Sequence, residues 1–344
     1  MASHRLWVAM SGGVDSSVAA AIALSQGWDV VGVTLDLGRG GPDAGAILAA
    51  RAICDRLHVG HRVIDVSAEF DLKVVDYTAA EYAAGRTPNP CVVCNQRIKF
   101  GTLYDAAIAE HAHLATGHYA RVAETVAGLA LAAARDVAKD QTYFLYRLDS
   151  ETLEHVLFPL GDLTKDAVRE RARSLGFAGV HTDESQDACF VGPGGYAALV
   201  TERRPDACVP GPVLNAAGDV LGSHRGVCRY TVGQRRGLGI ASDEPMYVTR
   251  IDASANAIVV GPADDLLVSR VVASDTVWRE AGLEACVDVK CRYNSPPTPA
   301  LVRRDGDILV AELERPIAGV APGQSLVCYN SGVVVGGGTI EEAS

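Results

Sequence analysis

The stretch AMSGGVDSS, residues 9–17, decides the fold of the first part of the chain. It follows a short apolar run at residues 5–10 and precedes a helix-like segment at residues 17–26. Gly12 and Gly13 let the backbone approach a ligand closely, and the free N–H groups at the start of a helix form an anion site. The order of strand, glycine-rich loop and helix therefore predicts a phosphate-binding loop.

Strand-like and helix-like segments alternate outward from this loop. Apolar runs typical of strands lie at residues 29–35, 61–66 and 113–118, and helix-like segments at residues 44–57, 68–84 and 96–111. Such alternation predicts an α/β fold, a doubly wound parallel sheet with helices on both faces. Ligands of these sheets bind at the carboxyl ends of the strands, where the glycine-rich loop falls.

The pattern changes near residue 159. Residues 164–176 predict a helix with Thr164 as its N-cap, and a glycine-rich region follows. Beyond residue 266, the apolar and charged residues of CVDVKCRY (286–293) alternate, and turn signals recur. This pattern is typical of a small β-barrel. We expect three domains: residues 1–158 with the phosphate loop, a small central domain at residues 159–265, and a C-terminal β-barrel at residues 266–344.

Composition favours a globular protein. The chain has 344 residues, 48% of them hydrophobic, and no apolar run reaches the roughly 18 residues that a membrane span needs. The N-terminus does not resemble a signal peptide. We expect a soluble, cytoplasmic protein with no membrane partner. The net charge of −11 argues against nonspecific nucleic-acid binding, although residues 223–250 carry five arginines against two acids.

The chemistry of the loop can be narrowed further. It lacks the lysine of the G-x-x-x-x-G-K-[ST] loop. The alternative is the SGGxDS loop of enzymes that split ATP between the α and β phosphates and form an adenylate. Several adenylating families share that loop, so the loop alone leaves the substrate open.

Nine cysteines are scattered along the chain, as expected for thiols in a reducing compartment. Cys91 and Cys94 precede a predicted helix, with Asn95 as its N-cap, so the helix dipole, Arg97 and Lys99 predict moderately activated thiols. A structural zinc site would need two more ligands, and a purely structural pair is the other alternative. Cys189 lies in a polar loop at residues 183–192. The remaining cysteines are assigned to packing: Cys54, Cys208, Cys228, Cys286, Cys291 and Cys328.

Taken together, the motifs resemble the tRNA-specific 2-thiouridylase family, within the PP-loop ATP pyrophosphatases. The resemblance covers nearly the whole chain, and it implies a PP-loop, adenine nucleotide alpha hydrolase-like fold followed by the central domain and the barrel. The motifs that carry it, in order, are MSGGVDSSV (10–18), AGRTPNPCVVCNQRIKF (84–100), ATGHYAR (115–121), KDQTYFLY (139–146), LFPLGDLTKDAVR (157–169), SQDACFVG (185–192), YTVGQRRGLGI (230–240) and PGQSLVCYN (322–330).

The resemblance implies a reaction. Such an enzyme uses ATP and Mg²⁺ to adenylate the C2 oxygen of the wobble uridine in tRNA, and a cysteine persulfide then delivers sulfur while AMP leaves. Cys189 matches the persulfide carrier. Cys94 matches the second catalytic cysteine, which releases sulfide from the persulfide or closes a disulfide with Cys189. The implied partners are tRNA and an upstream persulfide donor, a cysteine desulfurase or a relay protein, and we expect a monomer.

The resemblance also implies binding residues. Three residues would surround the target base: Asn89, Pro90 and Cys91. The ATP contacts would be Ala9, Met10, Ser11, Gly12, Gly13, Val14, Asp15, Ser16, Leu35 and Gly117. The tRNA contacts would be His118, Lys139, Asp140, Gln141, Arg292, Tyr293 and Gln324.

One departure from the family concerns Cys91, which stands where many members carry an aspartate that has been assigned proton transfer. The thiol could serve as acid or base, or Cys91, Cys94 and Cys189 could together hold a [4Fe–4S] cluster. We favour the persulfide route over the cluster. Two further hypotheses are another PP-loop adenylating enzyme acting on a small substrate, and a redox or cluster-binding module that recognises RNA without releasing pyrophosphate.

Overall fold

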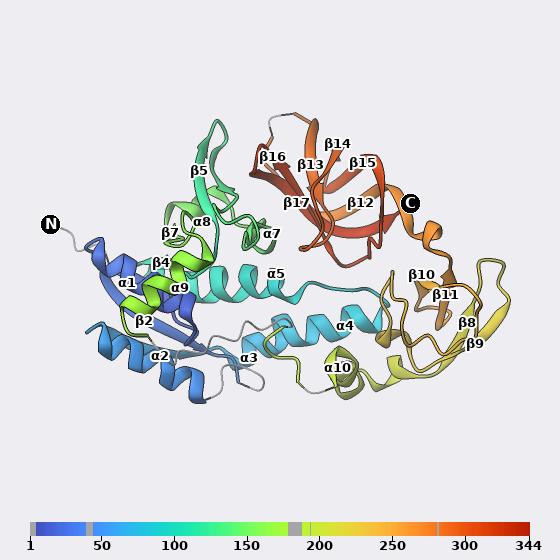
Figure 1. The fold of residues 1–344 in the computed structure, drawn as a ribbon, viewed down its shortest axis with the longest axis horizontal. Coiled ribbons are helices and arrows are strands. Elements are labelled where there is room, and N and C mark those ends of the chain that lie inside the picture. The colour runs from blue at the N-terminus through green and yellow to red at the C-terminus, as the bar shows by residue number, and fades with distance from the viewer. Residues whose placement is uncertain (1–4, 39–43, 178–187, 193, 281) are drawn as a thin grey trace. The chain divides into compact units, whose positions relative to one another are not determined.

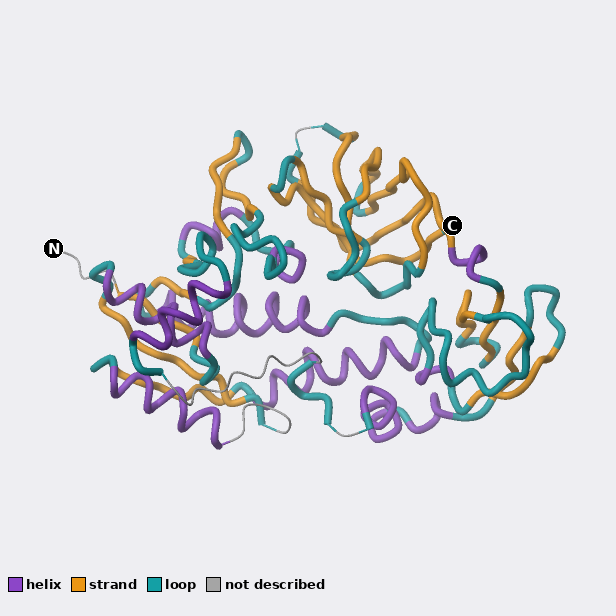
Figure 2. Tube along the Cα trace, viewed as in Figure 1, coloured by secondary structure: helices purple, strands orange, loops and turns teal. Residues whose placement is uncertain are grey.

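The computed structural model describes residues 5–38, 44–177, 188–192, 194–280 and 282–344. The chain divides into two compact units. The first comprises residues 1–73, 91–190 and 332–334, and the second comprises residues 74–90, 191–331 and 335–344. Helices and strands alternate along the first half of the chain, whereas strands dominate its last part (Figure 2). The domain boundaries at residues 158 and 265 stay predictions.

A five-stranded sheet forms the centre of the first unit (Figure 1). All its described pairings are parallel, which confirms the predicted parallel sheet. The consecutive residues Leu6, Trp7 and Val8 are each at most 2% exposed, as expected for a strand that is covered on both faces. In spatial order the strands are β3 (Gly60–Asp65), β2 (Asp29–Asp36), β1 (Arg5–Ala9), β4 (His113–Ala115) and β7 (Val156–Leu157).

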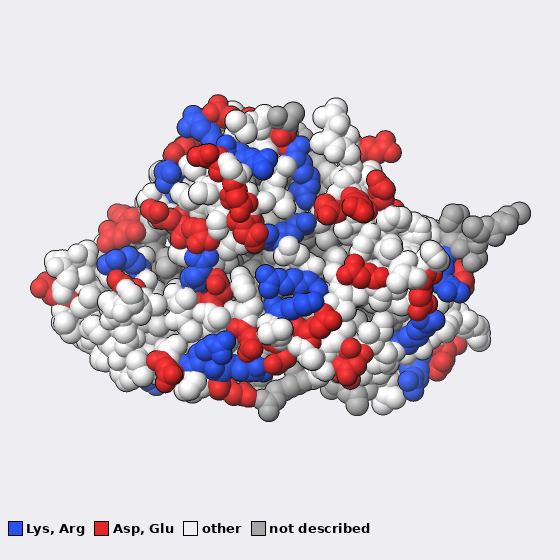
Figure 3. All heavy atoms as spheres, turned by 180° about the vertical axis from the view of Figure 1, so that it is seen from behind, with Lys and Arg blue, Asp and Glu red and all other residues white. Residues whose placement is uncertain are grey.

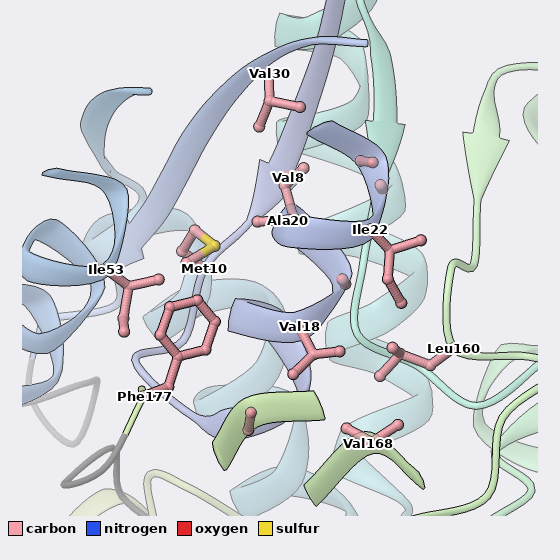
Figure 4. Packing of buried hydrophobic residues seen from close by; sticks show 14 of the residues in the cluster. Val8, Met10, Val18, Ala20, Ile22, Val30, Ile53, Leu160, Val168 and Phe177 are labelled. Atoms are coloured by element: carbon pink, nitrogen blue, oxygen red, sulfur yellow. The ribbon is translucent and has the colours of Figure 1, made fainter. Parts of the chain in front are cut away.

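Three helices pack on this sheet around one apolar core: α1 (Val14–Ser25), α2 (Ala44–Arg56) and α9 (Lys165–Ser174). Figure 4 shows Val18 of α1 near Val168 of α9, Ile22 of α1 near Leu160, and Ile53 of α2 near Met10. The predicted N-cap of α9 is confirmed, because the Thr164 hydroxyl accepts a hydrogen bond from the backbone N–H of Ala167 at 3.3 Å.

Two longer helical segments combine α-helical and π-helical turns. The first runs through α3 (Ser67–Phe70), a π-helical segment (Asp71–Asp76) and α4 (Tyr77–Ala83). The second runs through α5 (Pro90–Cys94), a π-helical segment (Asn95–Leu103) and α6 (Tyr104–Ala109). The first matches the helix predicted at residues 68–84. The second begins six residues before the predicted start at residue 96.

Shorter elements complete the first unit. They are the antiparallel hairpin of β5 (Arg121–Thr125) and β6 (Gly128–Ala132), and the helices α7 (Thr142–Leu145) and α8 (Ser150–Glu154).

The second unit contains a four-stranded sheet and a barrel. The sheet has the order β10 (Tyr247–Asp252), β11 (Ala257–Gly261), β8 (Gly211–Leu214) and β9 (Val220–His224). The helical elements of the second unit include α10 (Gly195–Arg203) and three 3₁₀ turns, Pro205–Cys208, Val227–Arg229 and Ala263–Leu266.

Six antiparallel strands form the predicted C-terminal β-barrel. The barrel is closed by pairing between its first strand and its last strand. Val287, Val289 and Cys291 are each at most 6% exposed, which confirms the alternation read from the sequence. The strands are β12 (Leu267–Trp278), β15 (Ile308–Ala318), β14 (Thr298–Asp305), β13 (Glu284–Lys290), β16 (Ser325–Asn330) and β17 (Val333–Ala343).

Acidic and basic side chains are intermixed on the face drawn in Figure 3. Among the described residues, no helix combines the length and apolar character needed to cross a membrane.

Candidate active site

The glycine-rich loop leads from β1 into α1. Gly12 has a φ of +74°, and a Cβ there would lie 2.5 Å from the carbonyl oxygen of Ala46, so only glycine fits. Gly13 is the N-cap residue of α1. Its carbonyl oxygen accepts hydrogen bonds from the hydroxyls of Ser16 at 3.1 Å and Ser17 at 2.8 Å. The loop is therefore held in shape by its own serines, and the first N–H groups of α1 form a ready anion site.

Gly117 lies against this loop, and its contact with ATP stays a prediction. A Cβ at Gly117 would lie 2.8 Å from the backbone nitrogen of Ser16 and 2.9 Å from the carbonyl carbon of Asp15. The missing side chain leaves the first turn of α1 uncovered at this point. Leu35 is half-buried near the carboxyl end of β2, the edge of the sheet where a nucleotide is expected.

Asp15, in the first turn of α1, is held by two groups that the sequence did not single out. The Lys165 ammonium donates to both carboxylate oxygens, at 2.9 and 2.8 Å, and the Tyr119 hydroxyl donates to one of them at 2.9 Å. The Lys165 side chain is 11% exposed and that of Asp15 33%. Lys165 belongs to the motif at residues 157–169, but sequence alone gave no sign that it meets the loop.

Cys91 and Cys94 lie inside α5, which begins at Pro90. The prediction that both cysteines precede the helix is therefore wrong. Asn95 is not an N-cap: it is 3% exposed, and its side-chain NH₂ donates to the carbonyl oxygen of Phe144 at 3.2 Å. Proline at the start of a helix explains the difference, since its missing N–H is not needed there.

The predicted activation of these thiols is also wrong. Burial raises the pKa of the Cys94 thiol to about 11, and it raises the pKa of Cys91 and of Cys189. The positive charge of Lys99 lowers all three pKa values without offsetting that burial. Cys94 is half-buried, whereas Cys91 and Cys189 keep exposed surface, so the loss of solvent is greatest at Cys94, where it outweighs the helix dipole and the nearby cation.

The charge of Lys99 acts on all three cysteines. Negative charge on Cys189 raises the pKa of both Cys91 and Cys94, so all three sulfurs share one neighbourhood with Lys99. Phe190, the residue after Cys189, packs edge-on against Phe70 with ring centroids 5.5 Å apart. The acidic flank predicted around Cys189, at residues 183–187, lies outside the described residues.

His118 is buried and feels the charge of the same Lys99. It is 9% exposed, and its Nδ1 shares a hydrogen bond with the Thr116 hydroxyl at 2.8 Å. Burial and then the charge of Lys99 lower its pKa well below the usual value, so the ring is neutral. The rings of Phe100 and Phe158 lie 6.0 and 6.4 Å away. A direct contact of His118 with tRNA stays a prediction.

The three cysteines do not fit the [4Fe–4S] cradle considered above. Within the described ranges, no group of three or more histidine, cysteine, aspartate or glutamate side chains is placed to hold a metal ion. The cluster is therefore not favoured.

The residues expected to contact tRNA fall into both units. In the first unit, Asp140 accepts from the backbone N–H of Ala134 at 2.8 Å and from the Thr142 hydroxyl at 2.6 Å. Gln141 accepts from the backbone N–H of Tyr119 at 2.9 Å. These bonds shape the loop that follows Lys139.

In the second unit, Gln324 is tied to the loop that precedes Asn89. Its side-chain NH₂ donates to the carbonyl oxygens of Thr87 at 2.8 Å and Pro88 at 3.3 Å. Arg292 is exposed, and the Lys290 ammonium lies 5.6 Å from the centre of the Tyr293 ring. Gln324 thus holds the backbone just before Asn89, and a place for Asn89, Pro90 and Cys91 around the target base stays a prediction. Direct tRNA contacts of these side chains stay predictions.

Three family models match the chain in sequence. They are described as tRNA methyl transferase HUP domain, over residues 4–193, tRNA methyl transferase PRC-barrel domain, over residues 198–262, and Aminomethyltransferase beta-barrel domain, over residues 269–340.

Curated relatives match over nearly the whole chain. The "tRNA-specific 2-thiouridylase MnmA" of Heliobacterium modesticaldum is 42% identical over 351 residues, covering 97% of this chain and 91% of the relative. The protein of the same name from Maricaulis maris is 44% identical over 357 residues, covering 99% and 88%. Among solved structures, "U34-tRNA thiolase NcsA from Methanococcus maripaludis with its [4Fe-4S] cluster" is 17% identical, covers 60% of this chain and 65% of that one, and has a TM-score of 0.38, too low for any inference.

Proposed function

Since the chain belongs to the tRNA-specific 2-thiouridylase family, we propose that it makes 2-thiouridine through Cys189 and Cys94 at a site that includes the glycine-rich loop. The enzyme is a tRNA sulfurtransferase that uses ATP. The observation that supports the residue roles most directly is that the positive charge of Lys99 lowers the pKa of Cys91, Cys94 and Cys189 alike.

The first step is adenylation of the uridine C2 oxygen. That oxygen attacks the α-phosphorus of ATP, the bond to the β-phosphate oxygen breaks, and pyrophosphate leaves. The N–H groups of residues 12–16 and the dipole of α1 would bind the phosphates, with Gly117 leaving room above the helix. Mg²⁺ would neutralise phosphate charge, and the oxygen ligands of Asp15 suit that ion.

The second step is sulfur transfer. The terminal sulfur of a Cys189 persulfide attacks C2, a carbon–sulfur bond forms, and AMP leaves with the former C2 oxygen. The Cys94 thiolate then attacks the Sγ atom of Cys189, the sulfur–sulfur bond breaks, and its electron pair stays on the new thiocarbonyl sulfur. The protein is left with a Cys94–Cys189 disulfide, which an external thiol reduces.

Lys99 would supply positive charge for both steps of sulfur transfer. It is the cation that lowers the pKa of each of the three thiols, so it stabilises whichever sulfur carries negative charge during transfer. Cys91, next to the target-base residues Asn89 and Pro90, would exchange a proton with the base.

Recognition of tRNA would use exposed basic residues. Five arginines in residues 223–250 have exposed side chains, and arginine recognises phosphate groups bidentately. The target base must leave its stack to reach the cysteines, a movement that costs a few kcal/mol in nucleic acids. The basic residues are Arg225, Arg229, Arg235, Arg236 and Arg250. The further residues proposed to contact tRNA are His118, Lys139, Asp140, Gln141, Arg292, Tyr293 and Gln324.

Sulfur would arrive as a persulfide from an upstream cysteine desulfurase or relay protein, and the enzyme would act as a monomer in the cytoplasm. Reconstitution tests the whole proposal. The purified protein, with ATP, Mg²⁺, a persulfide donor and cognate tRNA, is expected to form 2-thiouridine, AMP and pyrophosphate in equal amounts. Full activity in both Cys94→Ser and Cys189→Ser would exclude these roles. Pyrophosphate release that needs a small amine in place of tRNA would indicate a different adenylating enzyme.

A further inference from the structure

A second pair of cysteines lies in the second unit, and the reaction above does not use it. The Sγ atoms of Cys208 and Cys228 are 2.7 Å apart, well inside ordinary non-bonded contact. Cys208 ends the 3₁₀ turn Pro205–Cys208, and Cys228 lies in the 3₁₀ turn Val227–Arg229. Twenty positions separate them in sequence, and no motif links them.

Backbone packing brings these two turns together. Gly226, just before the second turn, has a φ of +114°, and a Cβ there would lie 2.8 Å from the Cα atom of Cys208. Only glycine allows so close an approach. Cys228 is 2% exposed and packs with Tyr82 and Val200, whereas Cys208 is half-buried at the edge of the same cluster. Two facing thiols at this separation need little backbone movement to bond.

We propose that Cys208 and Cys228 form a disulfide when the folded protein meets a low-molecular-weight disulfide, a modification independent of the proposed sulfur transfer. The Cys208 thiolate attacks one sulfur of the oxidant, which forms a mixed disulfide and expels one small thiolate. The Cys228 thiolate then attacks the Sγ atom of Cys208 and expels the second. The two thiol protons pass to the two small thiolates, so the protein pair is oxidised and the small disulfide is reduced to two thiols.

Exposure sets the order of attack. Cys208 is the accessible partner. Burial, followed by the neighbouring Cys208, raises the pKa of Cys228 to about 12, so Cys228 does not react first with a reagent in solution. Once Cys208 is in the mixed disulfide, attack by Cys228 is intramolecular and gains from proximity. The product would be largely buried, which protects it from reductants.

The bond would join the 3₁₀ turn Pro205–Cys208, which follows α10, to the segment that leads into the arginine-containing loop. Cys228 is next to Arg229, and Arg235 and Arg236 follow within eight residues. The bond would close a loop that contains β8 and β9. A closed loop of about 20 residues limits the unfolded chain enough to raise the melting temperature of a unit of this size by roughly 6–12 °C.

Peptide mapping tests the bond directly. The full-length protein is incubated folded with oxidised glutathione, then denatured in the presence of a thiol-blocking reagent so that buried thiols are blocked as well, and digested with trypsin without reductant. Cleavage after Arg225 separates Cys208 from Cys228, so a linked peptide that disappears on reduction supports the proposal. Recovery of Cys228 as a blocked free thiol, or of both cysteines only as glutathione adducts, overturns it.

Melting temperature provides the second measurement. Oxidation is expected to raise the melting temperature of the wild type by more than that of Cys208→Ser. Both proteins keep Cys94 and Cys189, so the difference between their shifts excludes any effect of that pair. Cys228→Ala should behave like Cys208→Ser, while Cys286→Ser, which removes an exposed thiol on β13, should keep the full shift. Equal shifts in the wild type and Cys208→Ser would show that the bond does not stabilise the unit.

Discussion

Replacing Lys165 by methionine removes the cation that holds Asp15 in the first turn of α1. In the structure the Lys165 ammonium bonds both carboxylate oxygens, at 2.9 and 2.8 Å, and lies 5.8 Å from the centre of the Tyr119 ring. Methionine keeps the length and apolar body of the side chain and loses only the charge. The Asp15 carboxylate would then face the phosphate site without its principal counter-charge.

The magnitude follows from the geometry and the exposure of the two side chains. Unit charges 4 Å apart attract by about 4 kcal/mol at an effective dielectric constant of about 20. Desolvation of Lys165, which is 11% exposed, and solvent screening of Asp15, which is 33% exposed, remove much of that. We expect a net coupling of about 1–2 kcal/mol. If the binding of the ATP phosphates loses a similar free energy, kcat/KM for ATP falls roughly tenfold.

A double-mutant cycle with Lys165→Met and Asp15→Asn, followed by urea unfolding, measures the coupling. The pair Lys73–Glu69 is the matched control: its atoms are 2.7 Å apart, but its side chains are 40% and 46% exposed, so its coupling should stay near about 0.5 kcal/mol. Pyrophosphate release at varied ATP gives kcat/KM, and Lys165→Arg should retain most of it. No coupling, together with unchanged ATP kinetics in Lys165→Met, would refute the reasoning.

Three further outcomes follow from the site. Gly117→Ala places a methyl group 2.8 Å from the Ser16 nitrogen and should raise KM for ATP at least tenfold, whereas Gly60→Ala, which meets nothing within 4 Å, should not; equal kinetics in both would contradict the close contact. Burial raises the pKa of Cys94 to about 11, so the rate of its alkylation by iodoacetamide should rise with pH from 8 to about 10 and be at least about 100-fold slower at pH 8 than that of a free thiol. Mass spectrometry of the peptide of residues 87–97 measures this rate. A rate that levels off near pH 8.5 would show that the thiol is not desolvated. Gln324→Ala removes the two bonds to the loop before Asn89 and should cost about 1 kcal/mol of stability and slow thiolation more than ATP binding; unchanged thiolation would rule out that positioning role.

The parallel sheet, the barrel and the loop could be predicted because their signals are local. Alternation from Val287 to Tyr293 and the order of strand, glycine loop and helix around Gly12 each report on the nearest few residues. The Thr164 cap is local as well. Periodicity and capping act over a few residues, so a single sequence carries them.

The features that sequence missed depend on packing between distant segments. Lys165 meets Asp15 across 150 positions, and Cys228 meets Cys208 across 20. The raised pKa of Cys94 follows from burial, which the flanking Arg97 and Lys99 did not reveal. The helix that begins at Pro90 is hard to predict because proline is common both in loops and at the first position of a helix.

The identity of the sulfur carrier is the central claim, and persulfide mapping tests it most directly. The protein is loaded with the donor, freed from it and digested, and the mass of the peptide containing Cys189 is compared with that of residues 87–97, which contain Cys91 and Cys94. We predict one added sulfur atom on Cys189, which is lost when ATP, Mg²⁺ and tRNA are added and appears in an equal amount of 2-thiouridine. Formation of 2-thiouridine at the wild-type rate by Cys189→Ser, or discharge of sulfur from Cys91 instead, would contradict the account.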